Sequence, residues 1–366
     1  MEGLVYNYVF PIIRLSMEIQ NESIFVSSLR GFCRSLFIML GIFIAIFIAL
    51  FAIAAFQSPY QEEEKTKLSL LPNLEGDKTA APLNSPVILQ VNIKGVVGDP
   101  QILDTPAIES VLLDSRTGLL QHDRVKAVLL YLDTPGGTVV DSDNIYRLLM
   151  KYKKKYNVPV FGYINGLCAS GGVYISCAAD RLYCGPTAII GSVGVILGPF
   201  FNISEAIAKI GIEGRTLTQG IDKDMMNPIR PWKPDEDEVL QKLTSHFYHQ
   251  FVDVVVSGRP RIDKTKLVEE YGAKVFDGPT AQTLGYVDVA DSDYVTALAD
   301  LMKEANIDAS KPYQVVQILP QRNLWADLMQ GKSPLLNGKL EHHLQIGSND
   351  ASFIKDQFAY LYRPHG

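Results

Sequence analysis

The sequence lacks the residue patterns that define several common protein classes. Only four of its 366 residues are cysteines, and none of them forms a CxxC pair or a Cys/His run with zinc spacing. Neither a disulfide framework nor a metal site is therefore indicated. The net charge is −6 and no stretch is strongly basic, so the phosphate-neutralising surface of a nucleic-acid-binding protein is not expected.

One long uncharged run stands out in a composition that is otherwise globular. At 47% hydrophobic and 20% charged residues, the chain can bury a sizeable core. Residues 36–56 contain no charge and no proline over 21 positions, which is the length of a bilayer-spanning helix. A cleaved signal peptide is the alternative, favoured by the small residues Ala52 and Ala54, but the run exceeds the roughly 7–15 residues of a signal-peptide core.

The charges beside this run predict its orientation. Arg30 and Arg34 precede it, and Glu62, Glu63 and Glu64 follow it. Because cytoplasmic flanks are enriched in basic residues, we expect residues 1–35 to be a cytoplasmic segment and the rest of the chain to lie outside.

The remainder of the chain divides by periodicity into a tether, a folded domain and a tail. Residues 57–85 are polar and acidic, which predicts a flexible linker. Short apolar runs at 87–93, 125–132 and 158–163 predict buried strands, and helical patterns at 142–156 and 234–256 alternate with such runs. This indicates an α/β domain with a largely parallel sheet over residues 86–308. Residues 309–366 are poorly periodic and form an extension of unknown role.

Three glycine-bearing turns follow apolar strands and carry the candidate chemistry. They are Asp133-Thr134-Pro135-Gly136-Gly137, Ala169-Ser170-Gly171-Gly172 and Gly191-Ser192-Val193-Gly194. A serine at a strand-to-helix turn presents its hydroxyl where backbone N–H groups favour negative charge, and flanking glycines admit a substrate carbonyl. Ser170 is thus a candidate nucleophile; the alternative is that it only caps its helix. Cys168 is a second candidate nucleophile, although such a cysteine is more often a core residue.

No histidine lies near these turns in the sequence, so a Ser–His–Asp triad has no local support. The six histidines are scattered over a helix and the tail, at positions 122, 246, 249, 342, 343 and 365. A lysine can act as the base if burial lowers its pKa from about 10.4 towards neutrality. Lys223 is the candidate; the alternative is an ordinary loop lysine paired with Asp222 or Asp224.

The order of motifs resembles that of the signal peptide peptidase (protease IV) family. The resemblance covers about residues 87–300 together with the apolar run, and it rests on five motifs in the family's order. These are Asp133-Thr134-Pro135-Gly136-Gly137, Ala169-Ser170-Gly171-Gly172-Val173-Tyr174, Gly191-Ser192-Val193-Gly194-Val195, Gln219-Gly220-Ile221-Asp222-Lys223-Asp224, and Gly278-Pro279-Thr280-Ala281 with Gly285-Tyr286-Val287-Asp288. Asp222 departs from the aromatic or small residue that family members often have, and we expect it to point to solvent.

The resemblance implies a fold and a role for each matching residue. The fold is that of the Clp protease and crotonase superfamily, a repeated ββα spiral. Ser170 matches the nucleophile, Lys223 the general base and Ser192 the hydroxyl that orients the lysine. The backbone N–H of Gly136 or Gly137, together with Gly171, resembles the oxyanion hole.

The resemblance also implies a setting for this chemistry. The family degrades remnant signal peptides, without metal or other cofactor, at the bacterial inner membrane with its catalytic domain on the extracytoplasmic side. Members with one copy of the domain assemble into rings in which serine and lysine can come from neighbouring subunits. Peptides, the membrane and further copies of the chain are therefore the expected partners.

Two other functions fit part of the pattern. A crotonase-type enzyme acting on acyl thioesters would share the fold and the paired glycines, but coenzyme A esters are cytoplasmic whereas this domain is expected outside. A catalytically silent assembly protein would keep the motifs as structure only.

Overall fold

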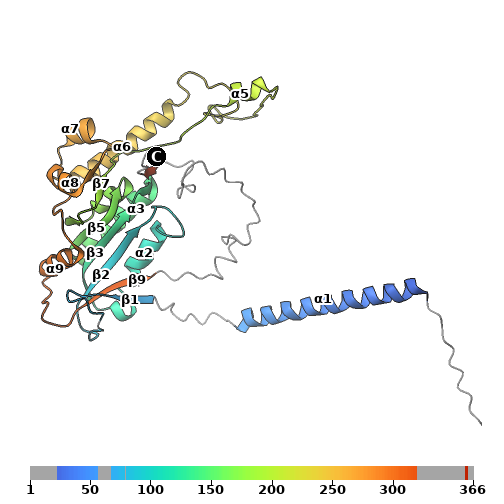
Figure 1. Cartoon of the computed structure of the whole chain (residues 1–366), viewed down its shortest axis with the longest axis horizontal. Helices are drawn as coiled ribbons and strands as arrows, with labels where there is room; N and C mark the ends of the chain where they lie inside the picture. Colours follow the sequence, from blue (N-terminus) through green and yellow to red (C-terminus); the bar gives the residue numbers. More distant parts are fainter. Residues whose placement is uncertain (1–22, 57–66, 79, 320–358, 362–366) are drawn as a thin grey trace, which may run out of the picture. The chain divides into compact units, whose positions relative to one another are not determined.

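The computed structural model describes residues 23–56, 67–78, 80–319 and 359–361 (Figure 1). The chain divides into two units, residues 1–64 and 65–366. The first contains helix α1 (Ile24–Phe56), within which Phe25–Phe51 is long and apolar enough to cross a membrane. The helix thus begins well before the predicted span at residue 36. Residues 1–22 of the expected cytoplasmic segment lie outside the described residues, as do residues 57–66 of the expected linker.

The second unit is built on an eight-stranded, mainly parallel sheet. Its strand order is β1-β9-β2-β3-β5-β7-β8, and β6 pairs with β5. Only the two edge pairs, β1 with β9 and β7 with β8, are antiparallel. The strands are β1 (Lys67–Leu71), β2 (Val87–Lys94), β3 (Val125–Thr134), β5 (Val160–Ala169), β6 (Arg181–Cys184), β7 (Ile189–Gly191), β8 (Val275–Asp277) and β9 (Gln314–Leu319). The predicted α/β class with a largely parallel sheet is confirmed.

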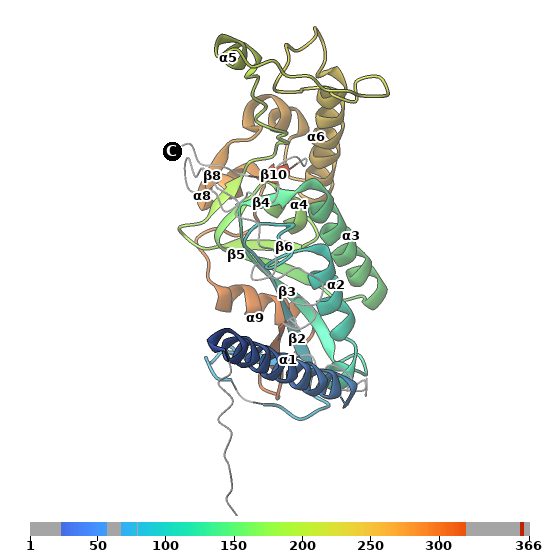
Figure 2. The ribbon, with the colours of Figure 1, turned by 90° about the vertical axis from the view of Figure 1, so that its right-hand side faces the viewer.

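Helices cover both faces of the sheet, as a parallel sheet requires. The helices are α2 (Thr105–Asp114), α3 (Val139–Tyr156), α4 (Gly171–Ser176), α5 (Ser204–Lys209), α6 (Glu238–Gly258), α7 (Lys264–Lys266), α8 (Gly278–Leu284) and α9 (Tyr294–Glu304). One face packs on α9, and the other packs on α2, α3 and α4 (Figure 2).

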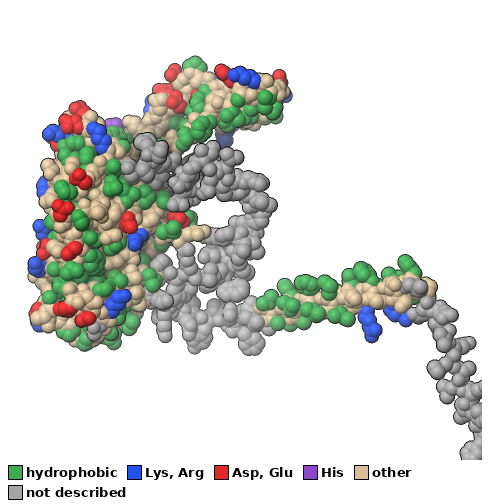
Figure 3. Space-filling model, in the orientation of Figure 1, with side chains coloured by type: hydrophobic (Ala, Val, Ile, Leu, Met, Phe, Trp, Pro, Cys, Tyr) green, Lys and Arg blue, Asp and Glu red, His purple; other side chains and the backbone are tan. Residues whose placement is uncertain are grey.

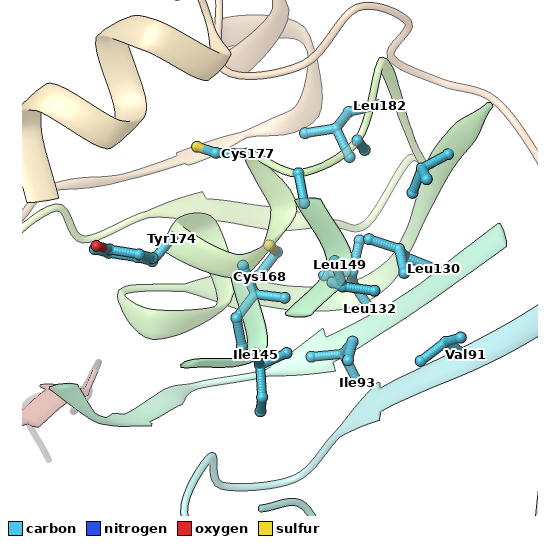
Figure 4. Close-up of a cluster of buried hydrophobic side chains, with 14 of the residues drawn as sticks. Val91, Ile93, Leu130, Leu132, Ile145, Leu149, Cys168, Tyr174, Cys177 and Leu182 are labelled. Atoms are coloured by element: carbon cyan, nitrogen blue, oxygen red, sulfur yellow. The ribbon is translucent and has the colours of Figure 1, made fainter. Parts of the chain in front are cut away.

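Alternation along the strands supplies two cores, one on each face. Leu130 and Leu132 of β3 pack with Ile145 and Leu149 of α3 (Figure 4), whereas Leu129 packs with residues of α9 on the opposite face. Because both sets are buried, a one-residue register slip in β3 would exchange the two faces, so the register that places the site is strongly specified.

Two strands correct the predicted domain boundaries. Lys67–Leu71, expected to lie in the linker 57–85, forms β1, and Gln314–Leu319, expected to lie in the tail 309–366, forms β9 between β1 and β2. The folded domain therefore runs at least from Lys67 to Leu319. The error has a physical reason, since strands of five or six residues give little periodicity and their stabilising partner lies far away in the sequence.

The segment that connects β7 to α6 forms a long arm that projects from the domain. Residues 192–237 contain only the short helix α5, and both views show this arm extending beyond one end of the sheet (Figures 1 and 2). The arm carries Lys223.

Candidate active site

Ser170 lies at the turn between β5 and α4. It is 1% exposed, and its backbone adopts φ 54° and ψ −116°. A positive φ is unfavourable for a residue with a Cβ, and such strain persists only where the surrounding structure enforces it. The Ser170 amide donates to the Gly191 carbonyl at 2.8 Å, and the Ser170 carbonyl accepts from Tyr174 N at 3.1 Å. These two bonds hold the residue in its strained conformation.

The Ser170 hydroxyl does not cap its helix. Ser170 is the N-cap residue of α4, but its side chain accepts no capping hydrogen bond. Its Oγ is buried and has no hydrogen-bond partner among the described residues. A buried hydroxyl without a partner costs about 1–3 kcal/mol of stability. The simple capping interpretation therefore does not account for this serine.

Ser192 lies at the end of the neighbouring strand. β5 and β7 are parallel, with Ala169 opposite Gly191, so the residues that follow these two both emerge at the same end of the sheet. Ser192 is buried, has φ 61°, and donates from its amide to the Lys274 carbonyl at 2.7 Å. The structure thus places Ser170 and Ser192 on adjacent strand ends.

The glycine turn after β3 forms the short strand β4 (Gly136–Thr138), which contacts α4. Gly136 has φ 91°, which favours glycine, and its amide donates to Thr134 Oγ1 at 3.0 Å. A Cβ at Gly137 would lie 1.8 Å from the Val97 carbonyl oxygen, so only glycine fits there. Because the Gly136 amide is already engaged, Gly137 is the better candidate for an oxyanion donor.

Thr134 is a positioning residue that the motif analysis did not single out. Its fully buried hydroxyl donates to the Gly95 carbonyl at 2.5 Å while accepting from Gly136. It thereby links the loop after β2 to the turn before β4. The only signal in the sequence was its place within the first of the three glycine-bearing turns.

Lys223 lies on the arm and not beside Ser170. Its side chain is exposed and lines a hollow formed by residues of the same loop, 216–228. No described hydrogen bond or ion pair joins it to Ser170 or Ser192. Asp222, the departure from the family pattern, lies 4.0 Å from Lys233 Nζ. Within a single chain, the structure therefore brings the two serines together and leaves the lysine apart.

An ion cluster fixes the loop that carries Lys223. Arg230 Nε bonds Asp224 at 2.7 Å, and its guanidinium also bonds Glu236. Glu236 additionally accepts from the amides of Met226 and Lys233 at 2.9 and 2.8 Å. The bond from Arg230 lowers the pKa of Glu236 from 4.5 to about 2.

An apolar pocket of about 650 Å³ begins at the residues that follow Ser192. It lies between the loop after β7, the start of α6 and the base of the arm. Its walls are largely hydrophobic and include Val193, Val195, Leu197, Phe200, Leu240 and Tyr248. Such a pocket suits an apolar side chain better than a charged one.

Cys168 is a core residue in this structure. It is fully buried, and burial raises the pKa of its thiol to about 12. The thiolate that a cysteine nucleophile needs is therefore disfavoured. His246 and His249 of α6 do not join a metal-binding group, since the described residues contain no cluster of three or more such ligands.

Comparison with known proteins agrees with these observations. Residues 152–308 match the model of peptidase family S49. A putative signal peptide peptidase SppA of Enterococcus faecium is 30% identical over 205 residues, covering 55% of this chain and 59% of that protein. A putative protease of Synechocystis is 34% identical over 169 residues, covering 46% of this chain and 60% of that protein.

ClpP1 of Listeria monocytogenes aligns at 14% identity over 57% of this chain and 94% of its own, with a TM-score of 0.38. This score is too low to bear on the fold, whose class follows from the strand order described above. These matches support a relationship between this chain and peptidase family S49. They also support the resemblance to the signal peptide peptidase A family found in the motifs, and the chain spans about three fifths of the length of the two relatives named above.

Proposed function

We propose that this chain is a membrane-anchored serine endopeptidase in which Ser170 is the nucleophile and Lys223 the general base. The observation that carries the proposal is the Ser170 hydroxyl, which is buried, strained into position and without a partner among the described residues. Strain and unsatisfied polar groups persist where function requires them. A hydroxyl that only served structure would be expected to use its hydrogen-bonding capacity.

The proposed reaction is acyl transfer. The neutral amine of Lys223 takes the Ser170 proton, and the alkoxide attacks a peptide carbonyl. The backbone amide of Gly137, with that of Gly171, stabilises the tetrahedral oxyanion, and one such donor contributes about 3–4 kcal/mol. Ser192 orients the amine. The peptide bond breaks with the proton passing from the lysine to the leaving amine, and water then releases the acyl-enzyme.

The lysine would come from a neighbouring copy of the chain. The arm that holds Lys223 exposes several large hydrophobic residues, among them Leu217 at 83% and Ile221 at 96% exposure, and hydrophobic side chains cover much of it (Figure 3). Exposed apolar surface of this extent is typical of a protein interface. Packing of the arm on a second copy would bury this surface and bring the amine into a dry environment.

The proposed substrates are remnant signal peptides, cut at the outer face of the bacterial inner membrane. The apolar pocket next to Ser192 supports a preference for hydrophobic side chains. Helix α1 supports anchoring, since it contains a span long and apolar enough for a bilayer. Peptides released into the membrane would then reach a tethered catalytic domain.

Mixing two inactive variants tests the shared site. Full-length Ser170→Ala and Lys223→Ala are purified separately, dissociated in detergent, mixed and reassembled. If the pair forms between copies, random mixing in a closed homo-oligomer restores about a quarter of the sites. Recovery of peptidase activity on mixing, and not in either variant alone, supports the proposal. No recovery from a mixed oligomer that has been verified by mass would contradict it.

A further inference from the structure

Strand β5 is irregular where it passes beside β3, a few residues before Ser170. Leu132 of β3 pairs with Ile164 and Thr134 pairs with Cys168, so β3 advances two residues while β5 advances four. The bulge over residues 165–167 therefore adds two residues to β5. Bulges bend a strand, and beside active sites they often re-aim a side chain.

The bulge coincides with a change of partner on the other edge of β5. Before the bulge, residues 161–164 pair with β6, and after it, residues 167–169 pair with β7. The second pairing is followed at once by the hydrogen bond from the Ser170 amide to the Gly191 carbonyl. The direction that β5 takes at the bulge thus determines where Ser170 lies at the end of β7.

The side chain of Asp133 lies against the bulge. Its Oδ1 accepts a hydrogen bond from the Leu167 amide at 3.2 Å, while its backbone carbonyl accepts one from the Gly95 amide at 3.1 Å. A Cβ at Gly166 would lie 2.8 Å from the same Oδ1, so the carboxylate is in close contact with the backbone of the bulge. A backbone amide without an acceptor inside a sheet is unfavourable, and Asp133 supplies the acceptor that the Leu167 amide needs.

We propose that Asp133 is a positioning residue that holds the bulge of β5 and thereby sets the place of the Ser170 hydroxyl. The proposal rests on the proposed function, since it takes Ser170 as the nucleophile. The effect passes along β5, because the carboxylate holds the Leu167 amide and the residues after it pair with β7 up to Ser170. Displacement of a reacting group by about 1 Å can lower a rate about a hundredfold. The apolar pocket has no residue of the bulge in its wall, so peptide binding should change little.

Three variants of the full-length chain test this contact. Asp133→Ala removes the acceptor and Gly166→Ala places a methyl group against it, so both should lower kcat by about ten- to a hundredfold. Asp133→Asn keeps an acceptor oxygen at the same place and should retain most of the parent kcat.

Asp180→Ala is the matched control at the other end of the same strand. Asp180 Oδ2 accepts a hydrogen bond from the Val160 amide at 2.9 Å, where β5 begins. The replacement also removes an ion pair with Lys153, so stability should fall while kcat does not.

The measurements are kcat and KM for peptide cleavage and the hydrogen exchange of the amides of residues 165–170. Lower kcat at unchanged KM, with faster exchange of the Ser170 amide, is expected in Asp133→Ala and Gly166→Ala and not in Asp133→Asn or Asp180→Ala. Parent kcat in Gly166→Ala, or an equal loss of kcat in Asp133→Asn or Asp180→Ala, overturns the proposal. If Asp133→Ala does not fold, Gly166→Ala and Asp133→Asn still decide.

A separate assay distinguishes failure of this proposal from failure of the proposed function. If Ser170→Ala still cleaves peptides, Ser170 is not the nucleophile and the proposed function fails. Exchange of the Ser170 amide in the Asp133 and Gly166 variants then still decides whether Asp133 holds this end of β5. Exchange that matches the parent in both Asp133→Ala and Gly166→Ala overturns the positioning role, whatever the nucleophile is.

Discussion

The amide of Ser170 donates a 2.8 Å hydrogen bond to the carbonyl of Gly191, the residue before Ser192. This bond joins the ends of two parallel strands and sets the distance between the proposed nucleophile and the hydroxyl proposed to orient its base. The position of both serines is thus determined by the sheet and its register. Catalytic groups held by regular elements are placed more accurately than groups on free loops.

Replacement of Ser170 should separate activity from stability. Ser170→Ala is expected to lower kcat by about a thousandfold or more, since it removes the nucleophile. It should also keep or slightly raise the free energy of unfolding, because the lost hydroxyl is buried without a partner. Peptide cleavage and thermal unfolding are the measurements.

Ser176→Ala is the matched control in the same helix. The Ser176 hydroxyl donates to the Val173 carbonyl at 2.8 Å, so its loss should cost about 1 kcal/mol of stability while cleavage continues. Activity retained in Ser170→Ala, or lost equally in both variants, would contradict the assignment of the nucleophile.

Lys223 should be distinguishable from Lys274, whose backbone carbonyl accepts a hydrogen bond from the Ser192 amide. Lys223→Ala and Lys223→Arg are both expected to inactivate, because a guanidinium stays protonated and cannot accept the serine proton. Lys274→Ala should remain active, although its carbonyl bonds the Ser192 amide, since that bond involves only the backbone. The pH profile of kcat/KM should rise with pH as the amine loses its proton. A profile that falls through the same range, or activity lost only in Lys274→Ala, would identify another base.

The ion cluster of Arg230 with Asp224 and Glu236, which fixes the loop of the arm, should be lost only in strong acid. The pKa of Glu236 is lowered from 4.5 to about 2 by its bond to Arg230, so the stability it contributes is present above its unfolded-state pKa and is lost as pH falls towards 2. Trp232, whose indole donates to the Asn227 carbonyl at 2.9 Å, reports on this loop. The chain has two tryptophans, so the other one is replaced by Trp325→Phe. The fluorescence of Trp232 should then change below about pH 3, and Glu236→Gln should abolish this change.

Circular dichroism recorded in parallel separates loosening of the arm from unfolding of the domain. A fluorescence transition centred near the ordinary range of a glutamate would show that Arg230 does not hold Glu236 as described.

The apolar pocket should set the preference for substrate side chains. Leu240→Glu places a charge in the pocket wall and should raise KM for peptides with large apolar side chains, by roughly tenfold if one well-buried side chain is lost from binding. Leu243→Glu is the control, because Leu243 lies on the same helix but not in the pocket wall. Equal KM values in the two variants would show that this pocket does not bind the substrate.

The sequence predicted the parts of the fold that local patterns determine. The buried strands β2, β3 and β5 and the long helices α3 and α6 were predicted, because their apolar periodicity is set by their own residues. Helix α3 begins at Val139, before the helical pattern predicted from residue 142, because the hydroxyl of Thr138 caps the helix by accepting from Asp141 N at 3.1 Å.

What the sequence could not predict depends on contacts between distant residues. The pairing of β9 with β1 and β2, and of β10 (Ala359–Leu361) with β4, joins segments that no local period relates. The strain and isolation of the Ser170 hydroxyl are likewise consequences of packing. The five motifs identified Ser170, Ser192 and Lys223 together as candidate catalytic residues. Only the structure shows that the lysine lies on an arm apart from the serines.

The most direct test of the account is the distance between Ser170 Oγ and Lys223 Nζ in a structure of the assembled, membrane-extracted particle. We expect the amine of one copy to lie within hydrogen-bond reach of the serine of another, at about 3 Å, with the Ser192 hydroxyl beside it. If these two atoms lie far apart in every pairing of neighbouring copies, with another basic group next to Ser170, the proposed dyad is wrong.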